Sequence, residues 1–453
     1  MLLLTVVLLL VLFLFSYMIF DKDFFAPPTV VCISFLFSAL CAMYNETAWG
    51  LDFSFNTTLV ILTGLGTFML GGVVGVFLTN GRKMNRFSFS HQVNPAQFID
   101  ISKVKILAVI AFQLIVLVWL YRHMIQTVGV TGISWSDIMS IYRNQSMHML
   151  GKDMTMRLPR LLEQSLILGF DVSMIFCYIV GNNLVVKKKI SLLYWIPVLL
   201  GTMMILMQGY RGGVIRLWIA ILVVWYTIQK RSDGWRTTKN TSRMIKKMVA
   251  SVLALAVLFA VSRELVGRKG TETEWSALYY ITFYGGCPIG ALDQYLRDPW
   301  DDNPYNMWGK ETFYFLNQNI LAWTGNVKER SFFAERGWAV TNNGTIIGNV
   351  YTALRQPIED FGYIGLPLVM GVMGCFFVFL YCKTRKKHGS GKIDFLLLIY
   401  SYCAYSFFVY FFSTYYLFIS TTFIKELIFW KISLWFLLSN FRITAGNHKS
   451  IIQ

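Results

Sequence analysis

The stretch LLLTVVLLLVLFLFSYMIF, residues 2–20, contains no charged side chain. It is long enough to cross a bilayer as a helix, which takes about 20 apolar residues. No Lys or Arg precedes it, and its apolar run is longer than the core of a typical signal peptide. We therefore predict a retained transmembrane helix that enters from the outside, and not a cleaved signal.

Similar apolar segments recur along the whole chain. Hydrophobic residues make up 55% of the 453 positions and charged residues only 14%, whereas about 25% of an ordinary soluble domain is charged. This composition excludes a single soluble domain and a disordered chain. We predict an all-α, polytopic membrane protein with about eleven transmembrane helices, at 2–20, 28–44, 58–79, 104–121, 161–181, 190–207, 213–229, 248–262, 361–382, 393–412 and 415–437. The last boundary, at Ser413–Thr414, is weak because it lacks Gly and Pro.

The basic residues indicate the orientation of these helices. The chain carries 41 Lys and Arg against 24 Asp and Glu. They cluster at 82–86, 187–189, 230–247 and 383–392, between apolar segments, where the positive-inside rule puts them. We place these clusters inside, the N-terminus outside and the C-terminus inside. The same distribution argues against nucleic acid as a partner.

Two long segments then fall on the outer side, at 122–160 and 263–360. The second holds nine basic and twelve acidic residues, half of all the acidic residues in the chain. It is also rich in Trp and Tyr, and long polar segments of this kind are where function concentrates. We predict an N-terminal bundle at 1–262, a large extracytoplasmic loop at 263–360, and C-terminal transmembrane hairpins with a cytoplasmic tail at 361–453.

Common cofactor and metal motifs are missing from the sequence. It has no Walker A loop, no GxGxxG before a helix, no HExxH and no paired CxxC, so we predict no cofactor and no metal site. Asp21-Lys22-Asp23 has the acidic form used by some metal-dependent glycosyltransferases. Because it falls on the inner side, we interpret it as a solvated helix end.

A tight outer turn, Gln208-Gly209-Tyr210-Arg211-Gly212-Gly213, joins two predicted spans. Glycine lets the backbone fold back and approach a ligand closely. Arg211 would then lie at the membrane surface, where a lipid-linked diphosphate would meet the guanidinium donors. The alternative is an arginine that reaches toward lipid headgroups.

A second polar segment precedes the predicted span at 361–382. Glu359 and Asp360 would stand at the positive end of that helix. One interpretation is helix capping, with Asp360 at the N-cap. The other is functional, with Arg355 and Asp360 at the mouth of a membrane cavity.

Together these pieces resemble the Wzy-type oligosaccharide repeat-unit polymerases of bacterial O-antigen, capsule and exopolysaccharide pathways. The motifs appear in the order of that family and cover roughly 200–375. They are Gly209-Tyr210-Arg211-Gly212, Tyr284-Gly285-Gly286-Cys287-Pro288-Ile289, Ala291-Leu292-Asp293, Trp308-Gly309-Lys310-Glu311-Thr312-Phe313, Asn349-Val350-Tyr351-Thr352-Ala353-Leu354 and Asp360-Phe361-Gly362. The paired Arg-x10-Gly motif described for some members is not found.

The resemblance implies a multi-pass glycosyltransferase of the bacterial inner (cytoplasmic) membrane. Such an enzyme transfers a growing glycan from undecaprenyl diphosphate to a new lipid-linked repeat unit, with a chain-length regulator and a flippase as possible partners. The leaving diphosphate needs positive charge, and the acceptor hydroxyl needs a base. We expect Arg211 to be catalytic, with Asp360, Glu359 or Asp293 as the base, and Arg263, Arg268, Arg355, Tyr351 and Trp308 to bind substrate.

Two other functions remain open. An O-antigen ligase would use the same donor with a different acceptor, and a flippase of lipid-linked glycans would do no chemistry. A transporter should carry charges along its spans, and here such charges are few. Two of them, Asp171 and Lys425, lie at matching depth. We predict that they pair, with Glu426 as a competing partner, or that they share a polar cavity under the active site.

Overall fold

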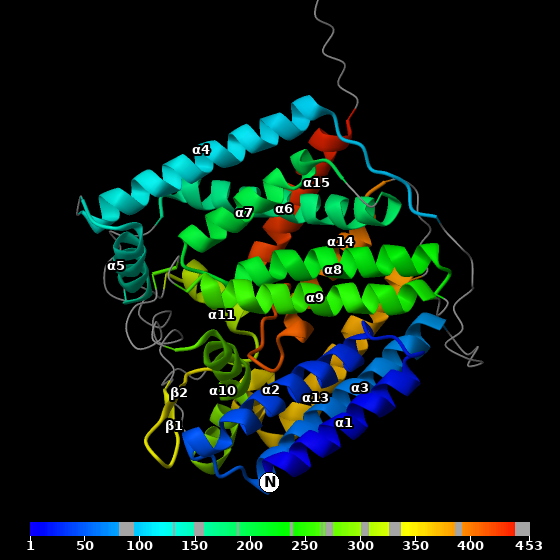
Figure 1. The fold of residues 1–453 in the computed structure, drawn as a ribbon, viewed down its shortest axis with the longest axis vertical. Coiled ribbons are helices and arrows are strands. Elements are labelled where there is room, and N and C mark those ends of the chain that lie inside the picture. Colours follow the sequence, from blue (N-terminus) through cyan, green and yellow to red (C-terminus); the bar gives the residue numbers. More distant parts are fainter. Residues whose placement is uncertain are drawn as a thin grey trace, which may run out of the picture.

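The computed structural model describes residues 1–80, 95–129, 132–148, 158–187, 190–235, 239–263, 266–267, 275–299, 308–325, 337–385 and 392–439. These residues are mainly helical (Figure 1), with one small antiparallel sheet of two strands, β1 (Ala339–Val340) and β2 (Ile346–Gly348). The helices are α1 (Leu2–Ile19), α2 (Pro27–Trp49), α3 (Phe55–Asn80), α4 (Lys103–Val128), α5 (Trp135–His148), α6 (Arg160–Val186), α7 (Ile196–Met207), α8 (Gly212–Ser232), α9 (Lys239–Val261), α10 (Ala277–Arg297), α11 (Tyr314–Trp323), α13 (Thr352–Arg385), α14 (Phe395–Phe408) and α15 (Thr421–Leu438).

Each predicted span overlaps a helix, but not every one of these helices is a clear membrane span. Among the described residues, seven helices are long and apolar enough to cross a membrane: α1, α2, α3, α4, α6, α8 and α13. Helix α14 has 14 residues, which is about 21 Å and shorter than the apolar core of a bilayer. Helix α7 is also short, and α15 carries three charged residues. The structure thus supports a multi-pass membrane protein, while the count of eleven spans stays a prediction.

The helix ends sort into two sets that agree with the predicted alternation. At one end, Tyr226 of α8 and Tyr381 of α13 both donate hydrogen bonds to Asp23, which follows α1. Close by, Arg231 pairs with Asp394 at 2.8 Å. All of these residues were placed on the inner side. Asp23 is buried, so the prediction that Asp21-Lys22-Asp23 is a solvated helix end is wrong for this carboxylate.

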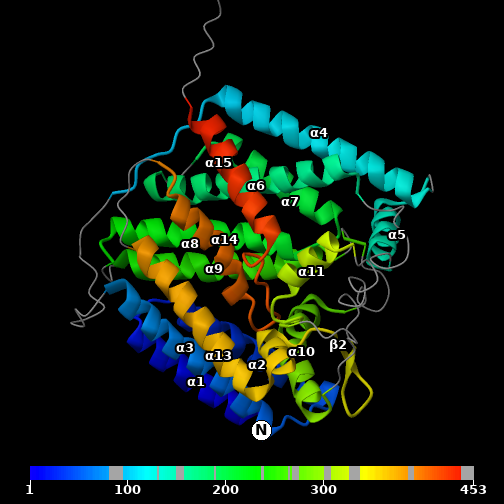
Figure 2. The same cartoon turned by 180° about the vertical axis from the view of Figure 1, so that it is seen from behind.

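The opposite end gathers the elements of the two predicted outer segments. Figures 1 and 2 both show α5, α11, β1 and β2 at this end of the long helices. Asn343, in the turn between β1 and β2, donates a hydrogen bond to the carbonyl of Ala48 at the end of α2. The described elements of the segments 122–160 and 263–360 therefore lie on one side of the bundle.

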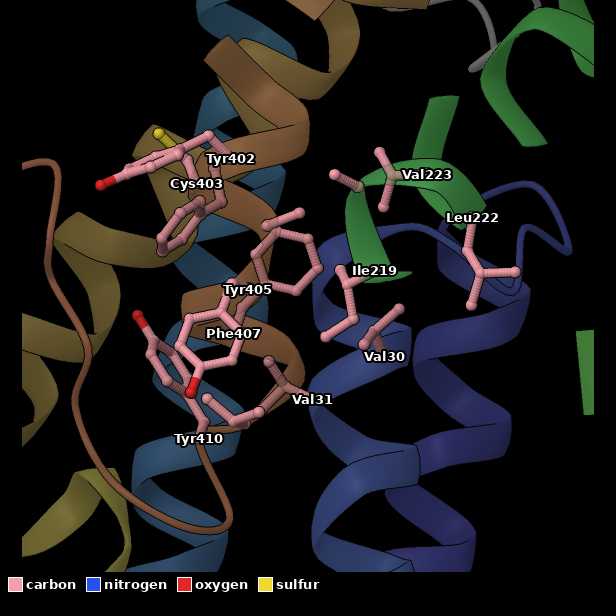
Figure 3. Close-up of a cluster of buried hydrophobic side chains, with 14 of the residues drawn as sticks. Val30, Val31, Ile219, Leu222, Val223, Tyr402, Cys403, Tyr405, Phe407 and Tyr410 are labelled. Carbon is pink, nitrogen blue, oxygen red and sulfur yellow. The ribbon is translucent and has the colours of Figure 1, made fainter. Parts of the chain in front are cut away.

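Helices α3 and α13 run parallel in close contact because glycines face each other between them. A Cβ added at Gly71 would lie 1.9 Å from the carbonyl oxygen of Gly371. One at Gly374 would lie 2.0 Å from the carbonyl oxygen of Phe68. Small residues let helix backbones approach in this way, as in membrane helix pairs generally. Figure 3 shows a second contact, where valines of α2 and aliphatic side chains of α8 meet aromatic side chains of α14.

Two interruptions of the helical backbone lie at or beside predicted span boundaries. Helix α13 begins at Thr352 and consists of two helices joined at a kink, so the predicted span start at 361 lies beside that kink and Asp360 is not at an N-cap. Gly362, with φ +69°, interrupts the helical backbone just beyond. Between α14 and α15, residues 409–420 are non-helical and buried or partly buried, and they contain the predicted two-residue boundary at Ser413–Thr414.

Backbone carbonyl groups of the non-helical segment 409–420 accept hydrogen bonds from the start of α13. The amides of Thr352 and Ala353 donate hydrogen bonds to the carbonyls of Phe412 and Tyr410. Irregular backbone at membrane depth needs such internal partners, because lipid supplies none. The start of α13 therefore pairs with the segment that separates α14 from α15.

Candidate functional site

Arg211 lies in the turn between α7 and α8, as predicted, but it is enclosed by aromatic side chains. Only 8% of its surface is exposed. Its Nη1 donates a hydrogen bond of 2.6 Å to the hydroxyl of Tyr280 in α10. Its guanidinium lies 4.1 Å from the ring centre of Phe259 and 5.4 Å from that of Tyr284. Contacts of this kind hold a cation in place without cancelling its charge.

A second arginine stands at the same tyrosine. The guanidinium of Arg263 lies 5.7 Å from the ring centre of Tyr280, and that of Arg211 lies 5.6 Å from it. The Nη1 of Arg263 donates to the carbonyl of Trp275 at 2.8 Å. Within the described ranges, no carboxylate forms an ion pair with Arg211. We call Arg211, Arg263 and Tyr280 the arginine pair site, and two nearby cations favour an anion there.

Helix α5 packs against this site from the other long segment. Gly209, with φ +72°, lies against the side chain of Arg143. Gly267, with φ +69°, lies so close to α5 that an added Cβ would be 2.3 Å from the amide nitrogen of Ser140. Both predicted outer segments thus meet at the turn that carries Arg211.

Arg355 occupies a different environment from Arg211. It forms an ion pair of 2.7 Å with Glu311 and a second ion pair with Glu359 four residues along α13. Only 3% of its surface is exposed, and the rings of Tyr295 and Tyr351 cover it. With two carboxylates beside it, this guanidinium is neutralised and does not line an open cavity mouth.

Asp360, which one interpretation placed with Arg355 at a cavity mouth, forms no ion pair with Arg355 among the described residues. Its carboxylate accepts the amide of Glu311 at 3.1 Å and the amide of Thr312 at 2.6 Å. These bonds fix the turn at 308–313 before α11. Asp360 therefore organises a loop, and both of its oxygens are occupied.

The carboxylate oxygens of Asp293 also accept hydrogen bonds from other residues. One oxygen accepts the amide of Ser54 at 2.8 Å and the hydroxyl of Thr57 at 2.6 Å. The other oxygen accepts Nε of Arg297 at 3.0 Å. Asp293 is almost fully buried and joins α10 to the start of α3. Of the three carboxylates predicted as bases, Glu359 alone keeps an oxygen with no hydrogen-bond partner among the described residues.

The predicted substrate-binding aromatic residues differ from each other in exposure. Trp308 is 76% exposed and stacks on Phe313, with 5.3 Å between ring centres. Tyr351 is buried, and its hydroxyl donates to the carbonyl of Gly337 at 2.5 Å. Arg268 lies outside the described residues.

The four residues predicted to be catalytic are not brought together. Tyr280, at the arginine pair site, and Tyr295, over Arg355, are fifteen residues apart on α10, which is about 22 Å of helix. Asp293, Glu359 and Asp360 lie near Tyr295 and Arg355, at the opposite end of α10 from Arg211. The structure therefore does not place Arg211 beside any of the three candidate bases, and which of these residues are catalytic stays a prediction.

Sequence reasoning missed two features. The aromatic enclosure of Arg211 has a local signal, since Tyr280 and Tyr284 are four residues apart and share a face of α10. The neighbours of Asp171 were harder to predict. The one indication in the sequence is that Arg216 lies five residues after Arg211, inside the next predicted span. Asp171 faces Arg216 and Glu426, while Lys425 is exposed, so the predicted Asp171–Lys425 pair is wrong.

Comparison with known proteins finds no matching family model, no matching curated protein and no matching solved structure.

Proposed function

We propose that this protein polymerises oligosaccharide repeat units carried on undecaprenyl diphosphate, by glycosyl transfer at the outer face of the bacterial cytoplasmic membrane. The observation that carries the proposal is the arginine pair site, where Arg211 and Arg263 stand at one tyrosine ring. The ordered motifs at 209–212, 284–293, 308–313 and 349–362 supply the rest of the support.

The arginine pair site suits a diphosphate for two reasons. Each guanidinium offers a planar set of donors that matches phosphate oxygens. When the bond to the anomeric carbon breaks, negative charge grows on the leaving diphosphate, and fixed cations stabilise that transition state. The site is next to the ends of α7 and α8, so a lipid tail would remain in the membrane while the diphosphate meets Arg211.

The glycan of the substrate would extend from this site toward the turn at 308–313. The exposed ring of Trp308, stacked on Phe313 and beside Phe361, offers an apolar face on which a sugar can stack. In this proposal Asp360 holds that turn and Asp293 holds α10. Neither of these two carboxylates then accepts the proton of the acceptor hydroxyl. Glu359 can act as this base if the acceptor sugar reaches the position of Arg355.

A transporter of lipid-linked glycans is the second candidate, and one observation favours it. Asp171, Arg216 and Glu426 come from three different helices and face each other in the interior. Charges that gather inside a helix bundle are typical of transport pathways. An O-antigen ligase shares the proposed donor site and differs only in its acceptor.

The experiment that separates these functions uses the purified full chain in liposomes with lipid-linked repeat units from a host strain. A polymerase produces a ladder of longer lipid-linked glycans with no other protein present. A ligase produces glycan only when its lipid acceptor is added. A flippase produces neither, but it makes the substrate accessible to a glycosidase on the opposite side of the bilayer. Absence of the ladder under conditions where the chain is folded would rule out the polymerase.

A further inference from the structure

Three charged side chains are buried in the interior of the bundle, on α6 and on two helices that pack against it. Asp171 of α6 is 0% exposed, Glu426 of α15 is 5% exposed and Arg216 of α8 is 7% exposed. Asp171 interacts electrostatically with both of the others. The group joins three helices that are far apart in the sequence.

The surroundings of this group are aromatic. The Nη1 of Arg216 donates to the hydroxyl of Tyr402 at 3.2 Å, and its guanidinium lies 4.9 Å from the ring centre of Phe170. Figure 3 shows Tyr402, Cys403 and Tyr405 on α14. The described titratable and charged groups that face the two carboxylates or Arg216 are Tyr210, Tyr402, Cys403 and Tyr405.

The hydrogen bonds within the group are incomplete on the side of Asp171. Neither of its carboxylate oxygens has a hydrogen-bond partner at good geometry among the described residues. The indole of Trp430 faces Asp171, and its Nε1 also has no acceptor. Glu426 keeps one such oxygen, Oε2, and is influenced by Arg216 and Tyr402. An ionised carboxylate that is fully buried and accepts no hydrogen bond is strongly disfavoured.

The charges of the group do not balance if every member is ionised. Two carboxylates and one guanidinium leave one net negative charge in the interior, and Lys425 is exposed and does not reach inward. Breaking the balance of a buried ionic group is costly. One added proton makes the group neutral, and the carboxylate with fewer donors is the one that takes it.

From the burial of these groups and the two unpartnered oxygens of Asp171 we infer that Asp171 and Glu426 form a proton-binding site, in which Asp171 carries one proton while Glu426 stays ionised and balances the charge of Arg216. The site is linked to the surface because Arg216 also lies 5.5 Å from the ring centre of Tyr405. The hydroxyls of Tyr405 and Tyr210 meet beside Gly212, and Tyr210 is 41% exposed. Gain or loss of the proton would thus change the electrostatic environment of the turn that carries Arg211. The inference does not depend on whether the protein is a polymerase or a transporter.

Infrared spectroscopy of the purified full chain in lipid nanodiscs tests this directly at neutral pH. We expect the C=O stretching band of a protonated carboxyl group, and we expect it to shift when the chain is made with isotope-labelled aspartate. This measurement needs no variant, so it does not depend on whether a variant folds. Asp171→Asn should remove the band. Glu426→Gln should also remove it, because Asp171 then becomes the carboxylate that pairs with Arg216 and ionises.

The matched control is Glu163→Gln, which changes an exposed carboxylate of the same helix and should leave the band unchanged. Absence of the band in the unmodified chain would overturn the inference. So would a band that shifts with labelled glutamate and not with labelled aspartate. A band that appears only in sodium-free buffer would show that the site binds a cation in place of a proton.

Discussion

At the scale of single residues, the hydroxyl of Tyr280 should matter for anion binding. It accepts the 2.6 Å hydrogen bond from Arg211 and orients the guanidinium. A hydrogen bond to a charged group contributes about 1.5–3 kcal/mol, so Tyr280→Phe should weaken the binding of undecaprenyl diphosphate about tenfold or more. The measurement is the dissociation constant of the purified protein.

The neighbouring tyrosine provides the control for this substitution. The hydroxyl of Tyr279 accepts a hydrogen bond from Trp49 and not from Arg211. Tyr279→Phe should therefore leave the dissociation constant unchanged. Equal losses in the two variants would mean that Tyr280 acts only through packing.

The role of Asp360 gives a second prediction at this scale. Its carboxylate accepts two backbone amides of the turn at 308–313, and an amide side chain at this position accepts less well. Asp360→Asn should lower the unfolding free energy by about 1–3 kcal/mol, seen as a lower melting temperature in detergent. A variant with unchanged melting and abolished activity would instead favour the catalytic role first predicted for this residue.

The sequence alone points to Arg211 and cannot rank the carboxylates, for a physical reason. The Gly-Tyr-Arg-Gly turn is local, so its glycines and its arginine are visible side by side. The amides that bind Asp360 belong to residues almost fifty positions away, and one oxygen of Asp293 is bound by Ser54 and Thr57, more than 230 positions away. Whether a carboxylate is available depends on such distant partners.

At the scale of helices, the contact of α3 with α13 should tolerate no side chain at Gly71. A methyl group there would meet the backbone of Gly371, which cannot move as a flexible side chain can. Gly71→Ala should destabilise the fold by about 1–3 kcal/mol, the usual cost of overpacking. Thermal unfolding in detergent measures this change.

Helix α3 itself supplies the matched control. Gly66 has nothing within 4 Å of its added Cβ. Gly66→Ala should therefore be neutral or slightly stabilising, because alanine favours a helix. If Gly71→Ala behaved in the same way, the close helix contact would be wrong.

The apolar runs indicated the positions of the helices and, at Ser413–Thr414, the position of the break between α14 and α15, but not the length of that break. Hydropathy marks where a chain can lie in a membrane, and each predicted span overlaps a helix. The break at 409–420 is itself aromatic and apolar, so no change in composition reveals its length. Its backbone is satisfied by the start of α13, a contact that only the folded chain supplies.

At the scale of the whole molecule, the two ends of the bundle should face opposite sides of the membrane. Asn342 is exposed in the turn between β1 and β2, and Lys383 is exposed near the end of α13. In intact cells, Asn342→Cys should react with a membrane-impermeant maleimide and Lys383→Cys should react only after permeabilisation. The reverse pattern would invert the topology.

The native cysteines should interfere little with this labelling. Six of the seven are buried. Burial also raises the pKa of the Cys287 thiol, which keeps it in its unreactive form. Cys287 is therefore a poor probe of sidedness in the folded protein, and the unmodified chain serves as the background control.

The central claim is that Arg211 holds the diphosphate of a lipid-linked glycan while the glycan is transferred. The most direct measurement is the length of the glycan ladder made by the purified chain in liposomes, compared between Arg211→Lys and Arg160→Lys. Lysine keeps the charge of Arg211 but loses its paired donors, so we predict at least a tenfold loss of polymer at equal protein level. Arg160 is exposed at the start of α6 and its variant should match the unmodified chain. A normal ladder from Arg211→Lys would contradict the account.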